Sequence, residues 1–255
     1  RVKSKFSLSL KNLQLDIDHL EGIYNQSSFK GSGFLNFGKN EGMDLKVDVE
    51  HSNFKDARKM YALIFKNMKL PVVPEFNYEG SYRVLGGYGI ETLKIDGNIK
   101  GTDLTVLNEE AEKISTQFSL QNNFLNFKNI KIKKSRGEIN ANVSVNLTDN
   151  YIELEGGAQG LRLSDLNTYQ KLKLDYDGDL SIDFDGNGTT DNFSSRFKAR
   201  VYNTYIENIP ASPSNAIFYL GPEEVIVNAN LLSGKIKLDS KLNFKSRLVS
   251  VKSVA

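Results

Sequence analysis

The chain of 255 residues is long enough for one large all-β domain or two small domains. Its net charge of +2, from 33 basic and 31 acidic residues, argues against a long-range attraction to nucleic acid, and the absence of cysteine excludes disulfides and thiol-based catalysis or metal sites. The longest apolar runs, such as Tyr61–Phe65, fall far short of the ~18 residues of a membrane-spanning helix. Because Arg1 opens the sequence without a leader pattern, we expect a fragment of a longer protein whose membrane anchor lies outside it.

In chain order, the segment 53–69 is the one that departs from strand-like alternation. Its apolar residues, among them Phe54, Tyr61 and Ile64, recur at three- and four-residue steps, as on one face of a helix, and Pro71 ends the pattern. We predict a single amphipathic helix that caps one end of an apolar sheet. The functional alternative is a helix that gates lipid entry or lies on a membrane surface.

Nearly all of the remaining chain alternates apolar and polar residues with period two. Between Gly137 and Leu147, for example, Ile139, Val143 and Val145 share one face. This alternation is typical of strands with one apolar and one polar face, and turn pairs such as Asp-Gly and Ser-Gly separate them. The sequence therefore predicts one continuous all-β domain over 1–255, a long antiparallel meander of somewhat over a dozen strands.

Four stretches carry a family resemblance: "IDGNIKGTDL", "LNFKNIKIKKSRGEINANVSVNL", "LRLSDL" and "LLSGKIKLDSKLNF". With them, the chain from Phe6 to Phe244 resembles the AsmA-like superfamily, and within it the TamB (translocation and assembly module) family. The resemblance implies a periplasmic segment of an inner-membrane-anchored protein. It also implies a sheet curled into an elongated open trough (a β-taco) that serves phospholipid transport between the two membranes or outer-membrane protein assembly. Family members meet an outer-membrane BamA/TamA-type partner, here through parts outside this chain.

Two architectures satisfy the alternation. A single sheet cannot leave a large apolar face in water, so it either packs on itself as a β-sandwich or curls around a guest. The residues alone favour the sandwich, and the resemblance favours the trough. In the trough, the apolar face binds phospholipid acyl chains without enzymatic chemistry. We predict the following lining: Leu93, Ile95, Ile99, Leu104, Phe118, Leu120, Ile130, Ile132, Ile139, Val143, Val145, Ile152, Leu154, Leu172, Leu174, Leu180, Ile182, Phe197, Val201, Val225, Val227, Ile236, Leu238, Leu242 and Phe244.

The stretch "DFDGNGTTD" offers a different chemistry. Asp183, Asp185, Asn187 and Asp191 match the spacing of calcium-binding hairpin loops. The pattern occurs once, whereas calcium-propeller repeats recur, and Ser194 stands where an EF-hand needs its bidentate acid. An ordinary acidic hairpin with a Gly-Asn-Gly turn is the favoured interpretation, and an extracellular calcium-binding β-sandwich adhesin is the alternative.

Nothing in the sequence matches a catalytic motif. The acidic row at Asp175–Asp185 is best explained as the wet face of neighbouring strands balanced by lysines, rather than as paired catalytic acids. His19 and His51 stand in no metal-ligand pattern, and "GGYG" lacks the strand-then-helix context of a nucleotide site. A third functional alternative is a scaffold that assists outer-membrane β-barrel or autotransporter assembly by strand augmentation.

Overall fold

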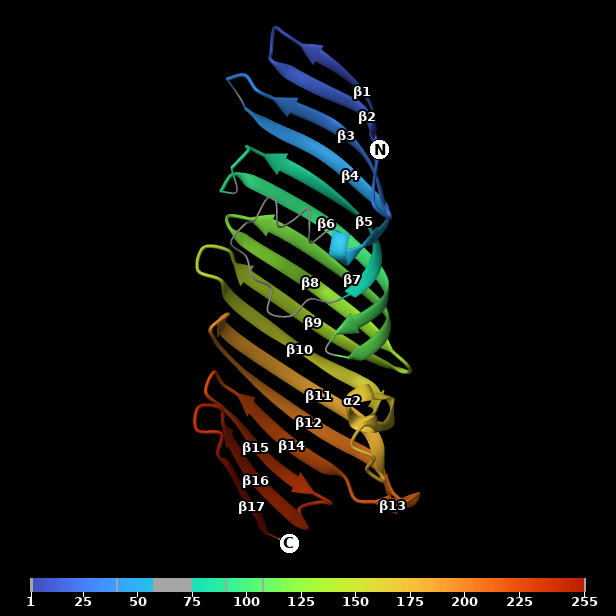
Figure 1. Cartoon of the computed structure of the whole chain (residues 1–255), viewed down its shortest axis with the longest axis vertical. Coiled ribbons are helices and arrows are strands. Elements are labelled where there is room, and N and C mark those ends of the chain that lie inside the picture. Colours follow the sequence, from blue (N-terminus) through green and yellow to red (C-terminus); the bar gives the residue numbers. More distant parts are fainter. Residues whose placement is uncertain (1, 40, 57–74, 90, 107, 255) are drawn as a thin grey trace.

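The computed structural model, which describes residues 2–39, 41–56, 75–89, 91–106 and 108–254, is one antiparallel sheet of 17 strands. Apart from the short β13, which pairs with the end of β12 while β12 pairs on to β14, each strand pairs with its neighbours in sequence, so the chain runs steadily from one end of the sheet to the other, as Figure 1 shows. The sheet is open and curled and does not close into a barrel. The predicted all-β open trough is confirmed, and the described residues form no second sheet that would make the β-sandwich.

The strands vary from three to fifteen residues in length. In chain order they are β1 (Val2–Ser9), β2 (Gln14–Tyr24), β3 (Ser27–Asn36), β4 (Gly42–Asn53), β5 (Glu75–Gly86), β6 (Leu93–Val106), β7 (Glu109–Gln121), β8 (Phe124–Lys134), β9 (Gly137–Asn146), β10 (Tyr151–Arg162), β11 (Tyr176–Thr189), β12 (Asn192–Ile206), β13 (Ile209–Ala211), β14 (Ser214–Leu220), β15 (Glu224–Leu231), β16 (Ile236–Asn243) and β17 (Val249–Val254).

In the described part of the chain, helical structure occurs in short segments between strands. A 3-10 turn, η1 (Leu163–Asp165), and one helical turn, α2 (Asn167–Gln170), connect β10 to β11. Of the helix predicted over 53–69, residue Asn53 instead ends strand β4, residues 54–56 are helical, and residues 57–69 lie outside the described residues. No helix in the described part of the chain is both long enough and apolar enough to cross a membrane.

The strand register aligns apolar residues of neighbouring strands on the same side of the sheet. Ile95 of β6 lies opposite Val84 of β5 and Leu120 of β7, whereas the next residue, Asp96, lies opposite Arg83 and Ser119. Because side chains alternate sides along a strand, such pairings put apolar residues on one side and polar residues on the other. We call these two sides the apolar face and the polar face.

β-Bulges keep the apolar face continuous where the alternation breaks. In β8, Phe127 and Ile130 are three residues apart, yet they lie opposite Val143 and Ala141, which are only two apart. The extra residue is absorbed at Asn129, whose φ of 53° is in the left-handed region that asparagine tolerates. The same device occurs in β10 at Gly160 (φ 68°), within a register shift between β10 and β11. Bulges also bend a strand and increase its twist, which contributes to the curl.

The bulge in β8 requires a residue at position 129 that tolerates a left-handed backbone conformation, and this requirement can be tested. Asn129→Val forces a β-branched side chain into the left-handed region, and we expect it to cost about 1–3 kcal/mol of unfolding free energy. Asn129→Gly is the matched control and is expected to stay within about 1 kcal/mol of the parent. Urea unfolding followed by circular dichroism measures both; equal destabilisation by the two variants would contradict a conformational requirement at this position.

Candidate functional site: the apolar face

The apolar face consists of rows of side chains that run across the strands. One row links Ile95, Leu120, Leu125, Val145 and Ile152 through successive strand pairs. Most of the predicted lining residues fall on this face, either in such rows or in the same alternation along their strands. They are Leu93, Ile95, Ile99, Phe118, Leu120, Ile130, Ile132, Ile139, Val143, Val145, Ile152, Leu154, Leu180, Ile182, Phe197, Val201, Val225, Val227, Ile236, Leu238 and Leu242.

Four predicted lining residues stand apart from these rows. Leu172 and Leu174 follow α2 in the connection to β11 and are 60% and 57% exposed, so they belong to a loop rather than to a strand face. Phe244 lies just past β16 and is 46% exposed. Leu104 is buried, next to Asp103, whose positive φ of 57° interrupts the alternation of β6. The period-two pattern of the sequence does not reveal where a strand ends or a bulge intervenes.

Three aromatic rings that the sequence analysis did not select, those of Tyr82, Phe127 and Phe184, join the predicted Phe118 and Phe197 on the same face. Phe118 lies between Tyr82 and Phe127, with ring centroids 6.3 Å from each. Further along the sheet, Phe184 and Phe197 lie with centroids 6.1 Å apart. All five residues alternate with polar neighbours in the sequence, which is the signal that identifies them. The rings add to the apolar area, and burial raises the pKa of the Tyr82 hydroxyl to about 12.

Glycines beneath these rings allow them to lie flat on the sheet. A Cβ added to Gly97 would come within 2.7 Å of the Phe118 ring, the Tyr82 Cβ and the Ser81 carbonyl oxygen. At Gly156 an added Cβ would lie 2.6 Å from the Phe184 ring. An aromatic ring therefore covers backbone that would otherwise be bare, as in the aromatic rescue of glycines in sheets. The result is a face without deep gaps.

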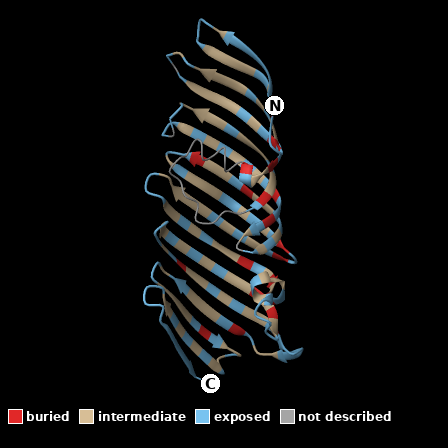
Figure 2. Cartoon of the chain, viewed as in Figure 1, coloured by how far each residue is buried: buried red, intermediate tan, exposed pale blue. Residues whose placement is uncertain are grey.

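The apolar face is partly enclosed and extends along the whole sheet. Figure 2 shows buried, half-buried and exposed positions alternating along the strands, and buried apolar residues such as Leu120 and Leu180 are 3% and 4% exposed. Most other residues of the rows are half-buried. β13 pairs only with the end of β12, so sixteen of the 17 strands stack, and at ~4.8 Å per strand the face is roughly 70 Å long. No described strand or sheet covers it from above.

One side of the face, at the strand ends of β10 and β11, is covered by the η1–α2 connection, as Figure 1 shows. Leu163 of η1 joins Ala158, Leu161 and Leu180 in a buried cluster, and further apolar side chains pack around it. They are Ile139, Leu166, Tyr169, Tyr176, Ile182, Ala199 and Val201. This cluster is a small conventional core, so a segment for which no helix was predicted covers part of the apolar face; the capping role predicted for 53–69 falls mostly outside the described residues and stays a prediction.

Glu109 fastens this cap to the distant hairpin of β6 and β7. Its carboxylate accepts hydrogen bonds from the backbone N–H groups of Asn167 (3.0 Å) and Thr168 (2.7 Å) at the start of α2. It also pairs with the Lys134 ammonium at 3.0 Å, and Lys134 donates to the Glu110 carbonyl at 2.7 Å. Burial alone would raise the pKa of Glu109, but the hydrogen bonds from Thr168, Lys134 and Asn167 outweigh it and lower the pKa to about 2.

The acidic stretch 183–191 does not form a loop around a cation in this structure. Asp183, Asp185 and Asn187 lie within β11, on the polar face, so their side chains are spread along the strand at about 6.7 Å intervals. The hairpin turn lies beyond them, where Thr189 pairs with Asn192, and the Gly-Asn-Gly sequence predicted as the turn is still in the strand. Asp185 pairs with Arg196 across the sheet at 2.9 Å. Nowhere in the described ranges do three His, Cys, Asp or Glu side chains gather where they would hold a metal ion.

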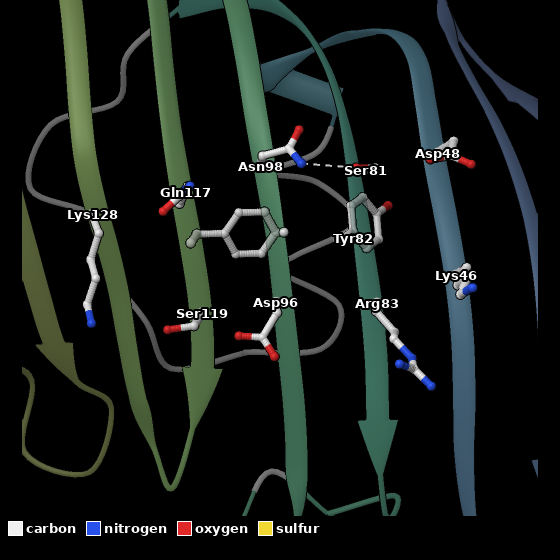
Figure 3. A pocket seen from close by; sticks show the side chains of 12 residues that line it. Lys46, Asp48, Ser81, Tyr82, Arg83, Asp96, Asn98, Gln117, Ser119 and Lys128 are labelled. Atoms are coloured by element: carbon white, nitrogen blue, oxygen red, sulfur yellow. Dashed lines mark hydrogen bonds between the residues drawn. The ribbon is translucent and has the colours of Figure 1, made fainter.

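The polar face carries its own hollows. One, of about 680 Å³, is lined mainly by polar side chains from β4 to β8, with Tyr82 and Phe118 among them. Figure 3 shows these side chains and the hydrogen bond that Asn98 donates to Ser81. Arg83, at its border, is held by Asp44, which accepts from the guanidinium Nε at 2.8 Å. A second hollow, of about 750 Å³, lies over β4 to β9. Most of the side chains around it belong to the polar face.

Comparison with known proteins adds no relative: no family model matches the chain, and no match was found among curated proteins or solved structures. The fold and the site define this protein as an open, curled all-β sheet with one continuous apolar face.

The Glu109 contacts predict a specific acid sensitivity. A group with a folded pKa of about 2 and an ordinary pKa of 4.5 stabilises the fold above pH 4.5, and this stabilisation is lost as the pH falls toward 2. The shift corresponds to about 3 kcal/mol at most. We expect Glu109→Gln to lower the unfolding free energy at pH 7 and to flatten its decline between pH 4.5 and 2. The control Glu110→Gln changes the neighbouring exposed carboxylate; an equal effect from both variants would contradict the role of Glu109.

Proposed function

We propose that this protein is a non-enzymatic lipid-binding and lipid-conducting module, whose apolar face holds acyl chains. The observation that supports the proposal is the continuous apolar face, about 70 Å long, that no second sheet covers in the described chain and that η1 and α2 cover only at β9 to β12. A soluble protein rarely leaves so large an apolar surface to water, and a lipid chain is a guest that fits a long, narrow one. Aliphatic rows and flat rings offer contact to CH₂ groups without hydrogen-bond donors that would select one headgroup.

Conduction follows from the uniformity of this lining. Each buried CH₂ contributes ~0.8 kcal/mol, less the cost of ordering the chain, and neighbouring positions along the rows are chemically alike. An acyl chain therefore meets small energy differences as it moves from strand to strand. The acyl chain would move along the apolar rows, and the core around Leu161 and Leu180 covers the strand ends at one side of the face.

We further propose, from the sequence resemblance to AsmA-like and TamB proteins, that this function belongs to a cell envelope. On that basis the chain is a periplasmic part of an inner-membrane-anchored protein that takes part in phospholipid transport between the inner and outer membranes. An outer-membrane BamA/TamA-type partner would be met through other parts of the same protein. Phospholipids are then the direct partners of the apolar face.

A charge placed in the lining tests the lipid proposal. Val145→Asp puts a carboxylate in the row beside Leu125 and Ile152, where an acyl chain would have to desolvate it. Ser144→Asp adds the same charge one residue away on the polar face. We expect native mass spectra and organic extracts to show phospholipid with the parent and with Ser144→Asp, and at least tenfold less with Val145→Asp. Lipid-free parent protein, or equal lipid in both variants, would count against the proposal.

The open sheet edges favour a second candidate, a scaffold for strand augmentation. Among the described strands, β1 pairs only with β2, and β17 pairs only with β16. Side chains of β17 are exposed along its whole length, with Val251 at 61%. An edge with free backbone groups accepts an incoming strand of another chain.

Proline at this edge separates the two candidates. Val251→Pro removes a backbone N–H of β17, and we expect it to reduce strand addition in an assembly assay while bound lipid is retained. Val251→Thr preserves the N–H and the strand propensity and serves as the control. If Val251→Pro abolished lipid binding and left assembly intact, the scaffold role would be rejected.

A further inference from the structure

The lysines of the polar face divide into paired and unpaired groups. On β11 and β12 the charges are matched: Asp185 meets Arg196 at 2.9 Å, and Asp183 lies directly opposite Lys198. On β6, β7 and β8 the matching is incomplete: Lys100 and Lys133 each have a glutamate directly opposite on one side, whereas Lys113 and Lys131 have none. Lys113 lies opposite Thr102 on one side and Lys133 on the other. Like charges directly opposite each other in a sheet are destabilising, so this placement has a cost in the free protein.

Four lysines share this site: Lys100, Lys113, Lys131 and Lys133. Lys131 lies opposite Ser115 and Asn140, so neither direct neighbour is acidic. Lys131 and Lys133 are two residues apart on β8, about 6.7 Å along the strand, and Lys113 and Lys133 have Cβ atoms about 5 Å apart. All four side chains are exposed, and none forms an ion pair with another described residue.

Four acidic residues line the same hollow. Glu79 lies opposite Lys100 and Glu138 lies opposite Lys133. Glu50 is held by Lys30, and Asp103 accepts a hydrogen bond from Thr102 at 3.0 Å. His51 and Tyr78 are the other ionisable residues of this hollow of about 750 Å³. The charges of the four lysines and four acids balance over the whole lining, so the excess of positive charge is local, at Lys113 and Lys131, which have no acidic residue directly opposite. The volume of the hollow is that of a small-molecule site.

We propose that this lysine hollow binds a phosphate-bearing anion. Ammonium groups carried by three adjacent strands converge on one space, and a multiply charged anion between them would turn the repulsion of Lys113 and Lys133 into attraction. The site is separate from the lipid-binding face, because the lysines project to the opposite side of the sheet. Free phosphate compounds and the headgroups of anionic lipids share this chemistry.

The test compares two charge-matched double variants of the full chain. Lys113→Gln/Lys133→Gln removes two charges from the hollow, and Lys198→Gln/Lys241→Gln removes two from elsewhere on the same face, opposite Asp183 and beside Glu224. Inorganic pyrophosphate is titrated by calorimetry, and vesicles of phosphatidylglycerol or phosphatidylcholine are tested by co-sedimentation. We expect the Lys113→Gln/Lys133→Gln variant to bind at least tenfold more weakly, because it loses one or more charge-assisted hydrogen bonds to the anion. The control variant is expected to change the affinity less than threefold.

The probes identify the source of the anion. Pyrophosphate binding indicates a soluble phosphate ligand, and binding of phosphatidylglycerol vesicles without pyrophosphate binding indicates a lipid headgroup. Without ligand, the hollow variant is expected to have a melting temperature equal to or above that of the parent, because the repulsion between Lys113 and Lys133 has been removed. This measurement distinguishes lost binding from a folding defect. Equal binding by both double variants, or no binding of either anion by the parent, would overturn the proposal, and neither result would bear on lipid occupancy of the apolar face.

Discussion

The structure depends on the register of its strand pairs. Except at the short β13, each strand pairs with its sequence neighbours, so the side on which a residue projects is determined by the register of the preceding strand pair. A one-residue slip anywhere would place lysines and aspartates among the leucines of every strand beyond it. The bulges at Asn129 and Gly160 correct the count where apolar residues are three apart, and their positive φ angles make these positions dependent on asparagine or glycine.

A single sheet provides only half of a conventional core. Where the chain does supply a second layer, at η1 and α2, it needs the carboxylate of Glu109 to hold the cap in place through backbone N–H groups and Lys134. Elsewhere the apolar face is stabilised by contacts within its own surface, with rings such as Phe118 lying across glycines such as Gly97. The face remains available to a guest because the interactions that stabilise it lie in the plane of the sheet.

The sequence predicted the all-β class and the apolar side of most strands, because alternation is a local property that pairing only propagates. It did not place Leu172 and Leu174 correctly, since two alternating leucines in a loop look like those of a strand. The turn after β11 was also displaced: the Gly-Asn-Gly sequence looked like a turn, but those residues pair with Phe193–Ser195 of β12. Contacts such as that between Glu109 and Thr168 join residues 59 positions apart and leave no local pattern. The unmatched lysines were invisible for the same reason, because only the register shows which charges lie opposite one another.

The two faces of the sheet constrain each other through the strands they share. In β8 the sequence Phe127–Lys133 alternates between an apolar lining and a lysine row, with one bulge between the two halves. Each strand therefore encodes both surfaces, and moving the bulge would exchange Ile130 and Ile132 with Lys131 and Lys133. An unbroken apolar face constrains only every second residue of a strand. Acids placed opposite the lysines would be compatible with the apolar face, as β11 and β12 demonstrate. The fold therefore does not require that Lys113 and Lys131 lack acidic residues directly opposite. We attribute the lack of such acids to the anionic ligand proposed above.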